Sequence, residues 1–153
     1  MILSGPTIRC LGIITPHEPR TRHLGLSYGE SYAGYDIRIG DAVEVVAGCT
    51  TLGISLERFA MPANVVGRVH DKSTWAREGL QVQNTIIEPG WSGWLTLELS
   101  LAPLHMTLRK MAISISAGTP IAQVIFEYVD CETEGYDGKY QNAGSGPQGA
   151  IWE

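Results

Sequence analysis

The chain has 153 residues, enough for one domain with a sizeable core, and 44% hydrophobic with 18% charged residues is typical of a globular protein and excludes extended disorder. The formal net charge of -5 argues against a protein that coats nucleic acid, because such proteins usually carry a basic face. It leaves room for a small anionic ligand, since a local basic pocket can lie in an acidic protein.

Most of the chain reads as short runs of strand type, separated by turns that contain glycine and proline. Residues 8–14 fit a strand or a helical turn, and residues 17–23 fit a polar connection. A short helix is expected over 73–78, with Ser73 or Thr74 as its N-cap. The expected strands cover residues 35–39, 43–46, 50–56, 65–69, 80–87, 94–101, two places within 104–116, and 121–129.

Many short strands with little helical periodicity predict an all-β barrel or sandwich. Gly48 and Gly53 are expected to interrupt the strands around them. Asp36 and Arg38 fall on one face of their strand. We therefore expect the two side chains to form a buried contact with a structural role. Residues 130–153 are polar and glycine-containing, which predicts a mobile C-terminal tail.

The stretch 71–99 concentrates polar residue types that are common in catalysis. Period 2 puts Leu95, Leu97 and Leu99 on one face of a strand and Glu98 on the other. If the second face lines a pocket, a partly desolvated carboxylate with a raised pKa can act as acid and base in turn. If that face is open to solvent, Glu98 is an ordinary surface residue.

Anion-binding groups gather at the start of the expected helix. Lys72, Ser73 and Thr74 bring an ammonium, two hydroxyls and backbone N–H groups that can converge on phosphate. A plain N-cap explains the hydroxyls equally well. Arg77 lies one helical turn after Ser73 on the same side, where the pair can polarise a carbonyl or orient a water.

The turn from Glu88 to Trp91 combines a carboxylate with a large aromatic side chain. Such a turn can hold a sugar hydroxyl and cover a ribose. A β-turn with a surface acid and an anchoring tryptophan is the alternative.

The cysteines favour a reducing environment. Cys10, Cys49 and Cys131 are far apart, odd in number and form no CxxC pair, so free thiols are expected. The first residues do not resemble a signal peptide, and no apolar run approaches the ~20 residues of a membrane span. We therefore expect a cytoplasmic protein without a membrane or nucleic-acid partner.

Several segments together resemble the dCTP deaminase family, which shares its fold with the trimeric dUTPases. The resemblance runs from about residue 27 to residue 141, with the motifs in order. The matching segments are Ser27-Tyr28-Gly29, Gly34-Tyr35-Asp36-Ile37-Arg38, Lys72-Ser73-Thr74-Trp75-Ala76-Arg77, Thr85, Glu88-Pro89, Trp91, Thr96-Leu97-Glu98, Ala122-Gln123 and Gly138-Lys139-Tyr140-Gln141.

The resemblance implies a single domain over residues 1–153, built as a distorted jelly-roll-like β-barrel of the dUTPase type with one or two short helices. It implies a homotrimer with active sites between subunits, and a tail over 130–153 that closes over the site. The implied reaction is hydrolysis of dCTP to dUTP and ammonia, supplying dUTP for dUMP and dTTP synthesis. Mg²⁺ would arrive on the triphosphate, and dTTP is a candidate inhibitor.

By position, the resemblance makes Glu98 the general acid and base, and makes Ser73 and Arg77 the residues that orient the water and stabilise charge at C4. Thr96 to Glu98 would border the base, and Glu88 and Trp91 the sugar. The implied substrate-binding residues are Lys72, Thr74, Trp75, Ala76, Thr85, Glu88, Trp91, Thr96, Leu97, Gln123, Tyr136, Lys139 and Gln141.

Zinc is the other known solution for cytosine deamination, with the signature His-x-Glu and a later Pro-Cys-x-x-Cys. None of the four histidines or three cysteines fits this zinc signature, so side chains alone are expected to activate the water.

The chain also departs from the family pattern at two positions. Ala143 stands where a phosphate-contacting glutamine is usual, and Gln141 or Gln148 is a candidate substitute. Asp71 replaces a usual glycine and adds a negative charge near the expected phosphate site.

Two other functions stay open at this point. The first is a dUTP pyrophosphatase, or a bifunctional enzyme that makes dUMP from dCTP, because residues 33–37 and 118–123 also resemble dUTPase motifs. Glu88 stands where those enzymes keep a water-activating Asp, whereas Arg77 and Glu98 follow the deaminase pattern. The second is a catalytically silent nucleotide-binding or regulatory protein on the same barrel.

Overall fold

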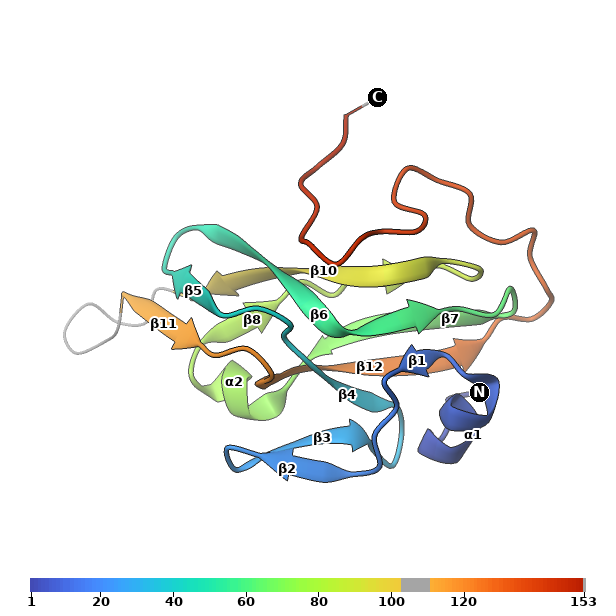
Figure 1. The fold of residues 1–153 in the computed structure, drawn as a ribbon, viewed down its shortest axis with the longest axis horizontal. Helices are drawn as coiled ribbons and strands as arrows, with labels where there is room; N and C mark the ends of the chain where they lie inside the picture. The colour runs from blue at the N-terminus through green and yellow to red at the C-terminus, as the bar shows by residue number, and fades with distance from the viewer. Residues whose placement is uncertain (103–110, 153) are drawn as a thin grey trace.

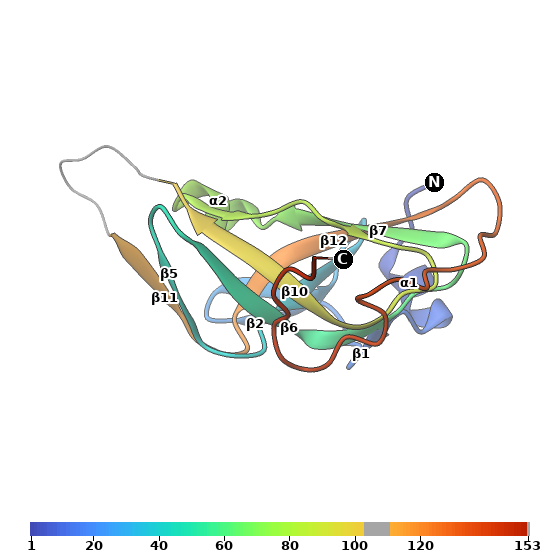
Figure 2. The same cartoon turned by 90° about the horizontal axis from the view of Figure 1, so that it is seen from above.

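The strands form two main sheets packed face to face, with a two-stranded arm at one end (Figures 1 and 2). The computed structural model describes residues 1–102 and 111–152. One sheet has the strand order β2-β3-β4-β12-β7-β9, the other β1-β6-β10-β8, and the arm pairs β11 with β5. The elements are α1 (Gly5–Leu11), β1 (Ile14–Thr15), β2 (Thr21–His23), β3 (Leu26–Glu30), β4 (Tyr35–Arg38), β5 (Val43–Val46), β6 (Thr50–Ala60), β7 (Val65–Asp71), α2 (Ser73–Arg77), β8 (Leu80–Val82), β9 (Ile86–Ile87), β10 (Ser92–Leu101), β11 (Ala112–Ile115) and β12 (Pro120–Tyr128).

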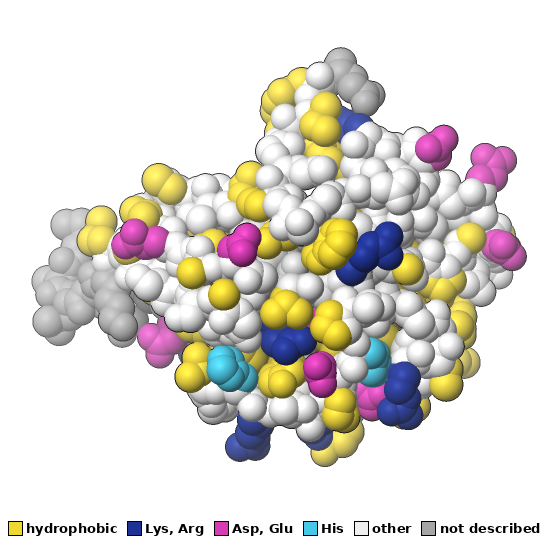
Figure 3. All heavy atoms as spheres, in the orientation of Figure 1, with side chains coloured by type: hydrophobic (Ala, Val, Ile, Leu, Met, Phe, Trp, Pro, Cys, Tyr) yellow, Lys and Arg dark blue, Asp and Glu magenta, His cyan; other side chains and the backbone are white. Residues whose placement is uncertain are grey.

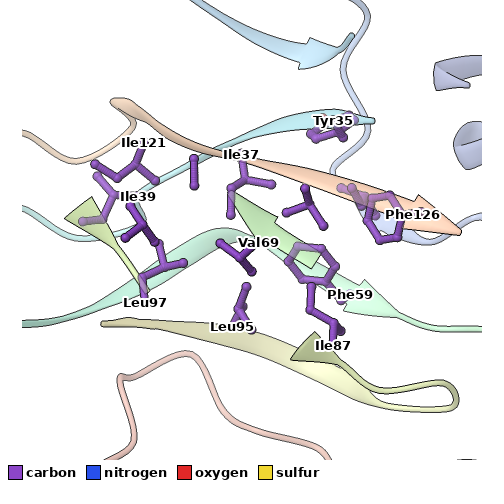
Figure 4. Packing of buried hydrophobic residues seen from close by; sticks show 14 of the residues in the cluster. Tyr35, Ile37, Ile39, Phe59, Val69, Ile87, Leu95, Leu97, Ile121 and Phe126 are labelled. Atoms are coloured by element: carbon purple, nitrogen blue, oxygen red, sulfur yellow. The ribbon is translucent and has the colours of Figure 1, made fainter. Parts of the chain in front are cut away.

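The core lies between the two sheets, where alternate residues of each strand point inward. Figure 4 shows Ile37 and Phe126 from the larger sheet above Phe59, Leu95 and Leu97 from the smaller one. These side chains are at most 8% exposed, with the intervening residues of β10 turned outward. The fold is therefore the all-β domain that the pattern of short strands predicted, with two short helices. Within the described residues, no helix is long and apolar enough to cross a membrane.

Two predictions about the strands were wrong. β6 runs through Gly53 without a break, because this glycine lets Ile39 and Leu99 pack directly against the strand. The single strand expected over 80–87 is two: β8 pairs with β10, whereas β9 pairs with β7 in the other sheet. Between β8 and β9, residues 83–85 carry the chain from one sheet to the other. The pattern of hydrophobic residues does not show this change of sheet.

Near the N-terminus, where a strand or a helical turn was expected over 8–14, the chain forms the helix α1 with Pro6 in its first turn. The polar connection expected over 17–23 contains the strand β2. Of the two strands expected within 104–116, the second is β11, and the first falls on residues outside the described part of the chain. The helix expected over 73–78 is α2, but its N-cap is Lys72 and no side chain caps it, so the predicted Ser73 or Thr74 cap was wrong.

The predicted Asp36–Arg38 contact was also wrong, because each side chain has a partner on another element. Lys72 Nζ lies 2.8 Å from Asp36 Oδ2, and Arg38 Nε lies 2.8 Å from Glu57 Oε1. Glu57 is fully buried, and this burial raises the pKa of its carboxyl despite the hydrogen bonds from Arg38. Both pairs stabilise the larger sheet and the junction of β4 with β6.

Candidate active site

A cavity of about 400 Å³ lies on the outer face of β10, away from the core. The C-terminal tail runs across this face (Figures 1 and 2). The cavity walls come from β6, the connection from β8 to β10, β10 itself and the tail. They are lined by Leu52, Thr85, Ile86, Ile87, Glu88, Trp91, Trp94, Leu95, Thr96, Glu98, Tyr136, Tyr140, Ala143, Gln148, Gly149 and Ala150.

Glu98 is one of two carboxylate residues that line this cavity, the other being Glu88. It lies in the middle of β10, opposite Leu52 of β6. Its Oε2 atom is buried and has no hydrogen-bond partner within the described residues. Burial raises the pKa of the Glu98 carboxyl, partly opposed by a hydrogen bond to backbone. The carboxyl is therefore poised for proton transfer and has an atom free to meet a ligand.

The outward face of β10 presents Trp94, Thr96 and Glu98 in sequence, as the period of 2 requires. Trp94 and the neighbouring Leu52 and Ile86 add flat and apolar walls suited to a planar ring. The sequence reasoning missed these three residues. The signal was present for Trp94, since it shares the alternation of Glu98.

The expected sugar-side residues also line the cavity. Thr85, Glu88 and Trp91 all contribute to its wall. Trp91 is 7% exposed, packs against Phe59, and donates from Nε1 to the carbonyl oxygen of Tyr140 at 2.7 Å. It is therefore both a wall of the cavity and an anchor for the tail.

The tail is pinned to the start of β10 by a series of hydrogen bonds. Trp94 N donates to the Ala143 carbonyl oxygen at 3.1 Å, and Gln148 N donates to Thr96 Oγ1 at 3.0 Å. Gly93 allows this approach, because a Cβ there would come within 2.7 Å of Ala143 N. The tail therefore forms one side of the cavity, whereas its mobility stays a prediction.

The three tail residues implied by the resemblance differ in position. Tyr136 lines the cavity. Lys139 is exposed and donates from Nζ to the carbonyl oxygen of Ile151. Gln141 lies outside the cavity wall, with its side-chain amide bonded to Ser92 N and the Gly90 carbonyl oxygen.

No residue of α2 is among the described residues that line the cavity. Ser73, Thr74, Ala76 and Arg77 are exposed on α2, and Trp75 Nε1 donates to the Pro120 carbonyl oxygen at 2.7 Å. Within one chain, the structure does not bring Ser73 and Arg77 to Glu98.

Three further positions have local partners away from the cavity. Lys72 is buried against Asp36, with Nζ also donating to Ser27 Oγ at 3.2 Å. Gln123 Nε2 donates to Ser31 Oγ at 3.0 Å. Leu97 is 1% exposed and points into the core, so only its backbone can face a ligand.

Asp71 also has a local structural role. Its Oδ1 accepts a hydrogen bond from Val82 N at 2.7 Å and so ties the end of β7 to β8. This bond accounts for an aspartate at this position without a ligand.

Positive charge is dispersed over one face of the molecule. On the face shown in Figure 3, lysine and arginine side chains are scattered and do not gather in one patch. Cys10, Cys49 and Cys131 are exposed and free. No group of three or more His, Cys, Asp or Glu that could hold a metal ion occurs in the described parts of the chain.

Comparison with protein families matches residues 36–129 to the dCTP deaminase-like family. A dCTP deaminase of Nitrosomonas eutropha is 32% identical over 168 aligned residues, which cover 85% of this chain and 86% of the relative. A dCTP deaminase of Polaromonas sp. is 34% identical with the same coverage.

Solved structures agree on the fold. The 2'-deoxycytidine 5'-triphosphate deaminase from Agrobacterium tumefaciens superposes with a TM-score of 0.62 at 18% identity, covering 82% of this chain and 47% of that chain. The dUTPase of EIAV superposes with a TM-score of 0.54 at 20% identity, covering 71% of this chain and 85% of that one. The distorted β-barrel of the dUTPase type, expected from the resemblance, is thereby confirmed.

Proposed function

The chain belongs to the dCTP deaminase-like family, and from this premise we propose that it hydrolyses dCTP to dUTP and ammonia. The observation that carries the proposal is the Glu98 carboxyl, with a raised pKa and a buried, unpartnered Oε2 inside the cavity. An ordinary solvated surface glutamate has neither property. The Mg²⁺ ion belongs to the substrate, as its triphosphate complex.

In the proposed reaction, Glu98 acts as base and then as acid. Its carboxylate takes a proton from water while the oxygen bonds to C4 of cytosine, and the proton passes to ring N3. The carboxylate then takes the second proton, from the new hydroxyl at C4, and delivers it to the exocyclic amine. The C4–N bond breaks, ammonia leaves, and C4 keeps a carbonyl oxygen. The atoms balance as cytosine plus water giving uracil plus ammonia.

The walls of the cavity support this assignment. Trp94, Leu52 and Ile86 offer apolar contact to the base, while Thr96 adds a hydroxyl beside Glu98. A mostly apolar site with few polar groups also keeps the carboxyl partly desolvated. Thr85, Glu88 and Trp91 then lie on the side proposed for the deoxyribose.

We propose that a second copy of the chain supplies Ser73 and Arg77, in a homotrimer with sites between subunits. Both residues are exposed on α2, free to face a neighbour, and absent from the walls of the described cavity. Without them the cavity lacks a cation to stabilise charge at C4 or to bind phosphate. Thr74, Trp75, Ala76 and Lys72 belong to the same proposed contact, with Lys72 acting through its support of α2.

A bifunctional enzyme that forms dUMP is the second candidate. Glu88 lines the same cavity as Glu98, so one site holds two carboxylates at different places. The fold is also that of dUTPases. The free, exposed cysteines support a reducing, cytoplasmic setting for either reaction.

The test is incubation of the purified chain with dCTP and Mg²⁺, with chromatography of the nucleotides and an assay of ammonia. Equal amounts of dUTP and ammonia support deamination, and dUMP with pyrophosphate supports the bifunctional enzyme. Tight binding of dCTP without either product would instead identify a silent nucleotide-binding protein and overturn the catalytic proposal.

A further inference from the structure

Two glutamines of the tail, Gln141 and Gln148, occupy different environments. Gln141 Oε1 accepts from Ser92 N at 2.8 Å and from Asn142 N at 3.1 Å. Its Nε2 donates to the carbonyl oxygens of Gly90 at 3.0 Å and Tyr136 at 2.6 Å. A carboxamide can form four such bonds, so the Gln141 side chain has no capacity left for a ligand. It is a clamp that holds the tail.

Gln148 is held only through its backbone. Its N–H donates to Thr96 Oγ1, whereas its side-chain amide makes no hydrogen bond within the described part of the chain. The side chain is half-buried and lines the cavity that contains Glu98. Neither amide atom of Gln148 is among the buried, unpartnered polar atoms of the described residues, so the amide is open to water and to any ligand that enters the cavity. A ligand with matching donors and acceptors can take the place of that water.

The path of the tail explains why Gln148 arrives at this point. The chain is fixed at Ala143 beside Trp94 and again at Gln148 beside Thr96. The residues between them, 144–147, are exposed. Ala143 also lines the cavity but has no side-chain polar group, so Gln148 is the first of the two anchored residues that can offer a side-chain hydrogen bond there.

The position selects the base as the partner of Gln148. Thr96 and Glu98 are two residues apart on one face of β10, which corresponds to about 7 Å along a strand. The backbone of Gln148 is bonded to Thr96, and the proposed function puts Thr96 and Glu98 next to the pyrimidine ring. Gln148 therefore lies close to the expected position of that ring. A carboxamide both donates and accepts, which matches the edge of cytosine with its ring N3, carbonyl oxygen and amine.

Resting on the proposed function, we propose that Gln148 hydrogen-bonds the pyrimidine ring of the nucleotide bound beside Glu98, and so selects the base while Gln141 holds the tail. Gln148 is then a specificity-determining residue at a position separate from the one occupied by Ala143.

The test compares two ligands by calorimetry, using the full chain with Glu98→Gln so that dCTP is not consumed. One ligand is Mg-dCTP, and the other is Mg-2-deoxyribose 5-triphosphate, which lacks the base. Gln148→Met keeps the length of the side chain and the backbone bond to Thr96 but removes the amide. Losing one or two hydrogen bonds should weaken dCTP binding roughly three- to tenfold and leave the base-free ligand unchanged.

Ser145→Ala is the matched control, since Ser145 is an exposed residue of the same tail. It should change neither affinity. Equal weakening of both ligands by Gln148→Met, or no weakening of either, overturns the inference. If the Gln148→Met change is silent while wild-type protein converts dCTP to dUTP, only this inference fails. If the Glu98→Gln chain binds no dCTP and the wild type forms no dUTP, the proposed function fails with it.

Discussion

Lys72 Nζ lies 2.8 Å from Asp36 Oδ2, and each of the two side chains is only 10% exposed. The pair joins the residue before α2 to β4, with Ser27 Oγ as a third member. The Lys72 ammonium is buried and already paired with the Asp36 carboxylate. Direct contact between Lys72 and a phosphate would therefore first have to break this ion pair. The pair therefore holds α2 in place for Ser73 and Arg77.

Lys72→Met is expected to lower the free energy of unfolding by about 3–5 kcal/mol, because it leaves the Asp36 carboxylate buried without its cation. Denaturant unfolding measures the change. Lys139→Met, at an exposed position, is the control and should stay within about 0.5 kcal/mol of the wild type. An unchanged stability together with a raised KM for dCTP would favour a direct phosphate contact for Lys72.

Glu98→Gln is expected to lower kcat by roughly 10²–10⁴-fold, since the amide cannot shuttle protons. In the wild type, the Glu98 carboxyl must be ionised to accept a proton from water. Because burial raises the pKa of Glu98, kcat/KM should fall on the acid side at a higher pH than for a solvent-exposed glutamate. A pH profile of dUTP formation measures this, and a wild-type rate in the variant would contradict the mechanism.

The same substitution should stabilise the fold at neutral pH. A raised pKa in the folded state means that the native chain binds the proton more tightly than the unfolded chain. The contribution of the Glu98 carboxyl to the free energy of unfolding is therefore fully present at low pH, where the carboxyl is protonated in both states. This contribution is lost as the pH rises through the raised pKa of the folded state. Thermal unfolding should show a higher Tm for Glu98→Gln at pH 7, with the difference shrinking in acid. A lower Tm at pH 7 would contradict this.

Two inactive variants should restore activity when mixed, if sites form between subunits. Arg77→Ala removes the cation on α2, and Glu98→Gln removes the acid and base. In an equal mixture of exchanging subunits, about a quarter of the interfaces would join an intact Glu98 to an intact Arg77. Deaminase activity near a quarter of the wild-type level is expected after unfolding and refolding the mixture. No recovery, with normal oligomers, would place Arg77 and Glu98 of one chain in the same site.

Gly93→Ala should detach the tail from β10. Its φ of 145° is unfavourable for alanine, and the added Cβ would collide with the backbone of Ala143. Limited proteolysis after residue 130 should become faster, and kcat/KM for dCTP should fall. Gly146→Ala is the control, because nothing lies within 4 Å of a Cβ there. Equal protease resistance in both variants would show that the tail does not depend on this contact.

Features that depend on local periodicity could be predicted from the amino-acid pattern alone. Alternation in β10 separated Leu95, Leu97 and Leu99 from Glu98, and the structure puts the leucines in the core and Glu98 in the cavity. Motif order was enough to indicate the family and the all-β barrel. These features could be read because a strand assigns each residue to a face by its position alone.

The contacts between residues that are distant along the chain became known only from the folded structure. It paired Lys72 with Asp36, and it used Gln141 as a clamp while leaving the amide of Gln148 in the cavity. It also kept α2 away from Glu98 within a single chain. Such partners are distant in sequence and are selected by the packing of two sheets and a tail, because hydrogen bonds and ion pairs depend on distances that no local pattern encodes.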